Sequence, residues 1–450
     1  MEVAADGAQF MPVGGFSVTI HMFLIRASLA GFLLALTSLV RAAAPEAFPV
    51  VWEESYDLGI ANHPLAVDLG FDGRPEVVLT DNQGNVVAID LESGRELWRQ
   101  NFGKTAFLSP LVGNFLGSGA QQILLCGNEK VVRLLDTRTG DLLGSVSCEL
   151  TPFVQPTLMP GAASGADRFI LIDDAGNIVL SRFKSTSELE VVWKFKTGSQ
   201  ALVPATVGPF SAAGKNDVVV TEFRGIITVL DGETGQTVGK FSLPSNHPIS
   251  ASVAMAQVEG QPEQQELVVA DARGYMVALK PGATPGSIIS IWPNAVSVVG
   301  SPVEALAAKD LNADGVADMI SVHHGDMIFV DGLSTEQFLW SAINPPIKTP
   351  PTIVTSADGK NYAFVIDSIG TFYAVAIEGR LAKTVATIRS GGSVESNMVA
   401  AAVGPQKKIV LFAIRRMGGE ALCYGTPWTS NQSDPVLWQT VGGSQLRSGN

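Results

Sequence analysis

The sequence predicts an all-β fold, an eight-bladed β-propeller built from four-stranded antiparallel blades. Three observations support this prediction. One unit of about 48 residues recurs from about Pro49 onward, a period typical of propeller blades rather than of helical repeats. The copies contain short apolar runs rich in Val and Ile, which favour pleated sheets. Turn residues separate these runs, and the chain holds 46 glycines and 25 prolines among its 450 residues.

The clearest copy of the unit runs from Pro64 to Gly103. It contains four short runs that favour strands: Leu65–Asp68, Glu76–Thr80, Asn85–Asp90 and Glu96–Asn101. Turn signals separate successive runs: Asp72-Gly73, Asn82-Gln83-Gly84 and Ser93-Gly94. Four strands joined by three turns make one antiparallel blade.

Seven further copies follow the same plan. They open at Ser109-Pro110, Gln155-Pro156, Val203-Pro204, His247-Pro248, Ser301-Pro302, Pro350-Pro351 and near Asn397. Turn glycines recur at spacings of 49, 49, 51 and 45 residues, at Gly176, Gly225, Gly274, Gly325 and Gly370. We find no long apolar pattern with the 3.6-residue period of a helix after the first 44 residues. The chain therefore favours repeated small sheets over a helical core.

A ring of blades needs a closing strand, and the sequence offers two candidates. The segment from Val51 to Tyr56 matches the outer-strand ends of the repeats and can complete the last blade from the other end of the chain. The C-terminal tail, with Trp428 and Trp438, can supply that strand instead. Either closure removes an open sheet edge.

The N-terminal region indicates export. Arg26 precedes an apolar run from Ala27 to Val40, and the small residues of 42–44 follow, as in a secretory signal peptide. The run is shorter than the roughly 20 residues of a spanning helix, although an uncleaved membrane anchor stays open. We expect an N-terminal extension and signal peptide (1–44), the propeller (45–440) and a C-terminal tail (441–450). A cleaved signal places a protein without a membrane span in the periplasm or outside the cell.

Charge and cysteine content limit the partners. The net charge of −13 repels phosphate backbones, so we expect no nucleic acid partner. An odd number of cysteines leaves at least one thiol unpaired or available between chains. The three are Cys126, Cys148 and Cys423. The first two fall in one repeat, on strands predicted not to be adjacent, and whether they form a disulfide stays open.

The skeleton of the repeat resembles two propeller repeat families. Its outer half is similar to the repeat of pyrroloquinoline-quinone-type propellers, matched by Gly84, Ala88, Ile89, Asp90, Gly94 and Trp98. Trp193 and Trp340 keep the outer tryptophan, whereas Val146 and Phe241 lie near that position in other units. Its inner half, as in residues 66–81 and 307–322, resembles the FG-GAP repeat of integrin-alpha-like propellers. The resemblance implies the fold more strongly than an activity.

One loop matches the calcium loop of FG-GAP repeats by position. The residues are Asp310, Asn312, Asp314, Val316 (through its carbonyl) and Asp318. Calcium prefers six to eight oxygen ligands, and alternate side chains around a glycine turn can face one point. A weaker copy keeps only Asp68, Asp72 and Glu76. A bound calcium ion would be structural; the alternative is a polar turn without metal.

The sequence favours an exported, non-catalytic propeller that acts as a scaffold for a protein or glycan partner in the cell envelope. No catalytic residues stand out, and we expect a monomer. Quinone dehydrogenases of the resembled family carry adjacent cysteines, which this chain lacks, so no pyrroloquinoline quinone is expected. Two alternatives stay open: an enzyme acting on polysaccharide or with a quinone, and a calcium-stiffened adhesion module.

Overall fold

The computed structural model describes residues 48–438 apart from short gaps. The gaps are 162–164, 250, 252, 260–264, 293–295, 298–302, 304, 324, 342–345, 348, 395, 416–418 and 435. The chain divides into a unit of Met1–Glu46 and a unit of Ala47–Asn450. The predicted signal (1–44) and tail (441–450) lie outside the described residues, so both stay predictions.

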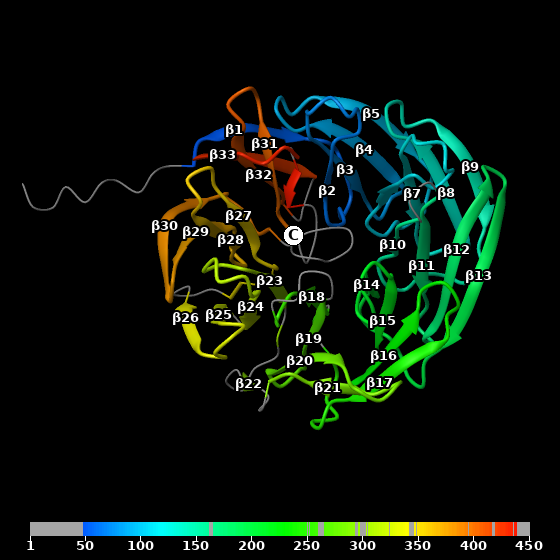
Figure 1. The fold of residues 1–450 in the computed structure, drawn as a ribbon. Coiled ribbons are helices and arrows are strands. Elements are labelled where there is room, and N and C mark those ends of the chain that lie inside the picture. Colours follow the sequence, from blue (N-terminus) through cyan, green and yellow to red (C-terminus); the bar gives the residue numbers. More distant parts are fainter. Residues whose placement is uncertain are drawn as a thin grey trace, which may run out of the picture. The chain divides into compact units, whose positions relative to one another are not determined.

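The second unit is a ring of eight antiparallel sheets, which confirms the predicted fold class (Figure 1). Blades 1 to 4 each contain four strands in chain order, from the centre of the ring outward. Their strands are β2 (Leu65–Val67), β3 (Glu76–Thr80), β4 (Asn85–Asp90) and β5 (Glu96–Asn101); β6 (Leu111–Gly113), β7 (Gln122–Cys126), β8 (Val131–Asp136) and β9 (Leu142–Ser147); β10 (Thr157–Met159), β11 (Arg168–Ile172), β12 (Asn177–Ser185) and β13 (Glu188–Lys196); β14 (Thr206–Gly208), β15 (Asp217–Thr221), β16 (Ile226–Asp231) and β17 (Thr237–Ser242).

Blades 5 to 8 continue the ring. Their strands are β18 (Ala254–Ala256), β19 (Glu266–Ala270), β20 (Tyr275–Pro281) and β21 (Ile288–Ser290), with β22 (Val296–Ser297) beside β20; β23 (Ala305–Lys309), β24 (Asp318–His323), β25 (Asp326–Val330) and β26 (Gln337–Ser341); β27 (Thr352–Thr355), β28 (Asn361–Ile366), β29 (Thr371–Glu378) and β30 (Leu381–Arg389); β31 (Val399–Val403), β32 (Lys408–Ile414) and β33 (Glu420–Thr429). No helix long and apolar enough to cross a membrane occurs in the described part of the chain.

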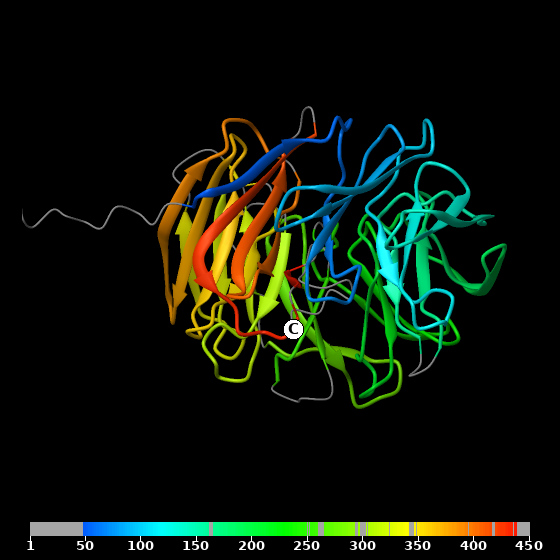
Figure 2. The ribbon, with the colours of Figure 1, turned by 90° about the horizontal axis from the view of Figure 1, so that it is seen from above.

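Both ends of the described chain join blade 8. Strand β1 (Val50–Ser55) pairs with β33 at the outer edge and places Trp52 opposite Cys423; it is the blue strand beside orange ones in Figure 2. Strand β34 (Val436–Trp438) pairs with β31 at the inner edge. The N-terminal closing strand is therefore confirmed. The C-terminal segment adds a fifth strand to the same sheet instead of replacing it.

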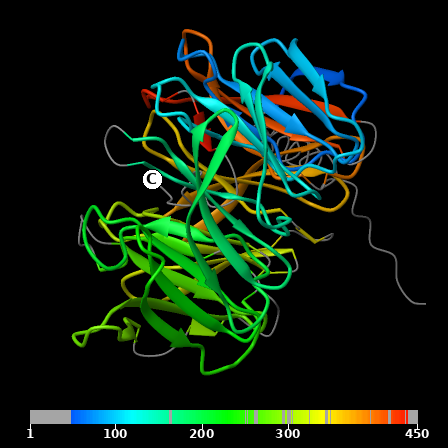
Figure 3. The same ribbon diagram turned by 90° about the vertical axis from the view of Figure 1, so that its right-hand side faces the viewer.

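Burial follows the position of each strand in its blade. The second strands β3, β7, β11, β15 and β19 bury all five of their residues. Middle strands are covered on both faces by neighbouring blades, which explains their continuous apolar runs. Outer strands expose more of their residues, as in β5, where Trp98 alone is fully buried. The twisted sheets are seen from the side in Figure 3.

The antiparallel order sorts the connections onto two faces of the ring. One face carries the segments between blades, such as 102–110, and the turns between second and third strands, such as 127–130. We call it the link face. Backbone bridges tie these links to these turns in several blades. The loop face carries the loops between first and second strands, such as 114–121, and the turns between third and fourth strands, such as 137–141.

Outer-strand tryptophans dock one blade on the next. Trp98 in blade 1 donates its indole N–H to the carbonyl of Thr137 in blade 2, at 3.0 Å. Its ring covers Gly140, where a Cβ would come within 2.5 Å of the indole, so the position admits only glycine. The same bond to a backbone carbonyl recurs at three further interfaces: Trp52 to Leu91, Trp193 to Gly232 and Trp292 to Gly332. At the blade 6–7 interface, Trp340 donates to the hydroxyl of Thr384.

The interfaces between blades 2 and 3 and between blades 4 and 5 lack this tryptophan. Gly144 and Gly239 occupy its place, each four residues after a turn glycine, as Trp98 follows Gly94. Each of these glycines lies against the outer hairpin of the following blade. A Cβ on Gly144 would lie 1.9 Å from the Thr186 carbonyl oxygen, and one on Gly239 would lie 3.0 Å from that of Gly286. These two interfaces are therefore docked by backbone contact with a hairpin.

Candidate functional site

The predicted calcium loop is the loop-face segment between β23 and β24. The Asp310 carboxylate accepts hydrogen bonds from the backbone N–H groups of Ala313 and Gly315, at 2.7 and 3.0 Å. Asp314 accepts one from the N–H of Val316 at 2.8 Å. These bonds are those of Asx turns, which close a loop without a metal.

The other two side chains of the loop are also engaged. The Asn312 amide donates to Asp314 at 3.0 Å. Asp318 is buried and accepts the N–H groups of Leu311 and Gly332, at 2.9 and 3.1 Å. In the described part of the chain no group of three or more His, Cys, Asp or Glu could hold a metal ion. The side chains of the loop are thus engaged by backbone N–H groups and by one another, and a calcium ion here stays a prediction.

The weaker loop of blade 1 has the same construction. Asp68 accepts the N–H groups of Asp72 and Gly73, at 3.1 and 3.0 Å. Glu76 accepts the N–H of Leu69 at 2.7 Å. The two loops are thus equivalent in structure, as the sequence predicted, and both are closed by their own backbone.

Glu76 and Asp318 belong to a set of buried polar residues that begin the second strand of a blade. The set is Glu76, Gln122, Arg168, Asp217, Glu266, Asp318 and Asn361. Most of them accept a backbone N–H from the loop before their strand. Burial raises the pKa of Glu76 to about 7 and that of Asp318 to about 6. Glu76 and Asp318, which the sequence suggested as calcium ligands, share this loop-closing role.

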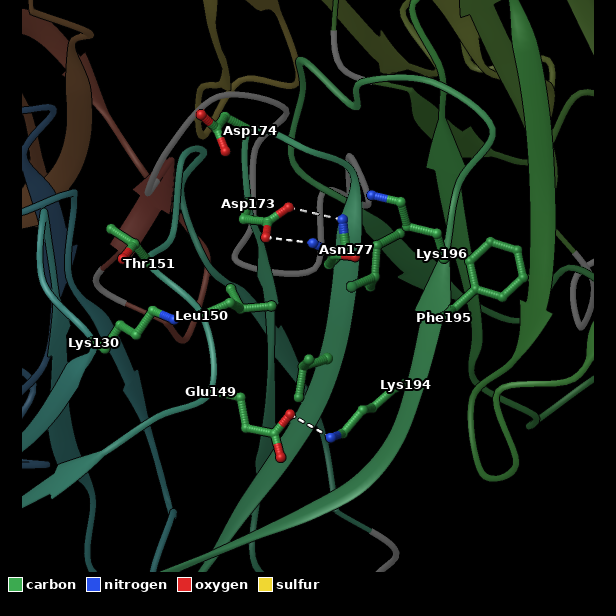
Figure 4. A pocket seen from close by; sticks show the side chains of 12 residues that line it. Lys130, Glu149, Leu150, Thr151, Asp173, Asp174, Asn177, Lys194, Phe195 and Lys196 are labelled. Atoms are coloured by element: carbon green, nitrogen blue, oxygen red, sulfur yellow. Dashed lines mark hydrogen bonds and ion pairs between the residues drawn. The ribbon is translucent and has the colours of Figure 1, made fainter.

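A cavity of about 580 Å³ lies between blades 2 and 3, beside the link that joins them. Figure 4 shows Lys130 and Glu149 on the blade 2 side, facing Lys194 and Asn177 of blade 3. Glu149 and Lys194 form an ion pair across the gap. Asp173 accepts hydrogen bonds from Asn177. We call this cavity the 2–3 groove; its walls carry both signs of charge.

A cavity of about 460 Å³ lies at the equivalent place between blades 4 and 5, and we call it the 4–5 groove. It is lined by Leu243, Pro244, Ser245, His247, Arg273, Tyr275 and Val277. Tyr275 begins β20 as Asn177 begins β12, which shows that the two grooves are structurally equivalent. Both occur at interfaces without a docked tryptophan.

Sequence analysis missed both grooves. The available signal was a glycine at the place of the outer tryptophan, Gly144 in blade 2 and Gly239 in blade 4. At these positions the outer hairpin of the next blade contacts the backbone of the outer strand near the loop face. The opposite, link-face end of each interface is where the cavity lies.

Large apolar side chains are exposed along the link face. They are Ile60, Phe153, Leu202, Phe223 and Ile369, with exposed fractions of 59, 52, 38, 48 and 52%. On the loop face, Phe71 and Leu333 are exposed in loops, and Leu381 is exposed where β30 begins after its turn. These residues come from different blades, and exposed apolar groups on one face can be covered by a binding partner. The link face is therefore the candidate interaction surface.

The cysteines and the buried histidine offer no reactive site. Cys126, Cys148 and Cys423 are free thiols and buried, and burial raises the pKa of each. Cys126 ends β7 and Cys148 follows β9, and these strands are not adjacent, as predicted. His323 is buried with its Nε2 2.8 Å from the Ser321 hydroxyl. Protonated, buried thiols are poor nucleophiles.

The fold is shared with solved propellers of low sequence identity. BamB from Moraxella catarrhalis is 17% identical, with a TM-score of 0.55 over 85% of this chain and 98% of its own. Sqt1 from Saccharomyces cerevisiae is 12% identical, with a TM-score of 0.63 over 85% and 100%. The C-terminal WD40 domain of Sif2 is 12% identical, with a TM-score of 0.59 over 86% and 100%. Such identities establish the fold alone.

A search of curated proteins finds no match. A family profile described as outer membrane protein assembly factor BamB matches residues 38–332, which is more than half of the chain. The quinone-type repeat predicted from the sequence is thereby confirmed, whereas no match supports the FG-GAP part of the resemblance. Together with the eight docked blades, the profile shows that the chain belongs to the PQQ-repeat family described as outer membrane protein assembly factor BamB.

Proposed function

We propose that this chain is an exported, non-catalytic scaffold that holds a protein partner in the cell envelope through its link face. The observation that carries the proposal is the row of exposed apolar side chains on that face, beside two grooves between blades. Its membership of a family described as an outer membrane assembly factor supports a protein partner over a glycan.

The physical argument rests on rigidity. Blades fixed by tryptophan bonds and buried strands present the link face without a large ordering cost on binding. Exposed aromatic residues such as Phe153 and Phe223 supply buried area once a partner covers them. A periplasmic or secreted location is part of this proposal, because the partner is expected in the envelope.

Site-specific photo-crosslinking in the producing cell tests the proposal. A photoreactive amino acid at Phe153 or Phe223 is expected to give the same protein adduct. The same amino acid at Leu333, an exposed apolar position on the loop face, is the matched control and is expected to give none. Adducts of equal yield from both faces, or none from the link face, would overturn the proposal.

A further inference from the structure

The 4–5 groove combines an apolar floor with an aromatic rim. Leu243 and Val277 are buried in its floor, and Tyr275 stands at its mouth with 44% of its surface exposed. Phe223, in the neighbouring turn of blade 4, is also exposed on this face. An apolar side chain of suitable size from a partner can be buried in this groove without rearrangement of the blades.

The lining of the groove includes an arginine and no carboxylate in the described part of the chain. Arg273 lines the groove. Arg224 lies in the adjacent turn of blade 4. That turn is close to the link of the groove, because a Cβ on Gly225 would come within 2.7 Å of the His247 carbonyl oxygen. The nearby Asp271 is fully buried and accepts backbone N–H groups of its own turn.

Neither Arg224 nor Arg273 forms an ion pair with a described residue. The 2–3 groove differs, because Glu149 and Asp173 share it with its lysines. A locally positive, apolar groove in a chain of net charge −13 selects by charge as well as by shape.

We infer that the 4–5 groove binds an extended segment of the partner protein that carries an aromatic or branched apolar side chain beside a carboxylate. The apolar side chain packs on Leu243 and Val277 under Tyr275. The carboxylate pairs with Arg273, whose guanidinium can hold it with two hydrogen bonds. The inference rests on the proposed function, since it supplies the chemistry of that protein partner.

Three fluorescein-labelled peptides of nine residues test the inference by anisotropy with the whole protein. Each is a Gly/Ser chain with a central Phe, flanked by two Asp, two Asn or two Lys. The Asp peptide is expected to bind about tenfold more tightly than the Lys peptide. Arg273→Glu is expected to reverse that order, and Tyr275→Ala to weaken all three. Arg138→Glu, at an exposed turn arginine of the loop face, is the matched control and should leave the order unchanged.

Equal binding of the three peptides, or an order unaltered by Arg273→Glu, would overturn the inference. So would preferential binding of a neutral oligosaccharide. Photo-crosslinking at Phe153, which lies beside blade 3 and away from the 4–5 groove, distinguishes a failure of the groove inference from a failure of the proposed scaffold function. A surviving protein adduct in Arg273→Glu, with no peptide preference, refutes only the groove chemistry. The absence of any link-face adduct refutes the scaffold itself.

Discussion

The interface between blades 1 and 2 and the one between blades 2 and 3 solve the same packing problem differently. In the first, Trp98 fills the gap and bonds to Thr137. In the second, Gly144 stands where the tryptophan would be and lets the backbone at Thr186 come into contact. The first is held by a large side chain, the second by a hairpin whose strands β12 and β13 have nine residues each.

The difference has a consequence on the link face. A groove lies at each of the two interfaces of the hairpin type. Both interfaces remain well packed at their centres, with apolar clusters that include Phe169 at one and Val277 at the other. The two larger grooves thus lie at interfaces where a glycine replaces the docked tryptophan, although smaller cavities also lie at the tryptophan-docked interfaces between blades 5 and 6 and between blades 8 and 1.

The largest effect is expected from removal of a docked tryptophan. Trp98→Ala removes a buried indole and its bond to Thr137, and should lower the free energy of unfolding by about 3–4 kcal/mol. Val146→Ala, on the outer strand of blade 2 two residues beyond the matched Gly144, should cost only about 1 kcal/mol. Urea denaturation measures both. Similar losses in the two variants would remove the distinction between the interface types.

The hairpin contact is tested at its glycine. Gly144→Ala places a Cβ 1.9 Å from the Thr186 carbonyl oxygen, so the hairpin must shift, at a cost of about 2–3 kcal/mol. Gly239→Ala meets the equivalent atom of Gly286 only at 3.0 Å and should cost less. Thermal unfolding midpoints check the order. A stable Gly144→Ala protein would show that the hairpin does not dock the blade.

The loop-closing acids give a dependence on pH. Burial raises the pKa of Glu76 from 4.5 to about 7, so the folded protein binds the proton more tightly than the unfolded chain does. Stability from this group is therefore greatest below about pH 4.5 and falls as the pH rises to about 7. Glu76→Gln should remove that fall and gain on the order of 1–2 kcal/mol over the wild type above pH 7.

Gln122 supports this substitution, because it already accepts a loop N–H, that of Leu116, at the equivalent position of blade 2. The measurement is the difference in unfolding free energy between wild type and variant from pH 4 to pH 8. Asp174→Asn, at an exposed carboxylate of blade 3 that does not act on Glu76, serves as the control. A difference that is constant over the whole range would contradict the assigned pKa.

The smallest effect is expected from calcium. If the Asp310–Asp318 loop binds calcium as the resemblance implies, millimolar calcium should add about 1 kcal/mol to the stability of the wild type. A chelator should then lower the unfolding midpoint of the wild type and leave Asp314→Ala unchanged. Equal midpoints with calcium and with chelator would dismiss the metal and leave the hydrogen-bonded loop as the whole explanation.

Local patterns account for much of what could be predicted. The four strands of blade 1 lie within one residue of the predicted runs, because turn residues such as Gly84 and Gly94 adopt backbone angles that end a strand. The outer tryptophan was recognised as part of a repeat. Its partner in the next blade was not, since the bond from Trp98 to Thr137 joins residues that are 39 apart.

The sequence predicted the spacing of the acids in the candidate site but not the hydrogen bonds that their carboxylates accept. Asp310, Asp314 and Asp318 have the spacing of metal ligands, yet each carboxylate is directed to backbone N–H groups of its own surroundings. Spacing along the chain specifies which residues are close together. It does not specify whether a carboxylate faces a cation or an amide, because that depends on the loop conformation.

The sequence alone determined the class of fold and the number of blades, because these depend on a repeated local pattern of apolar runs and turns. It left open which terminus supplies the closing strand, and the structure assigned that role to β1. The tertiary structure decided which surface is available to a partner. The 4–5 groove forms from residues of two blades, and the apolar link-face residues come from many. Such a surface exists only once the ring brings distant segments together.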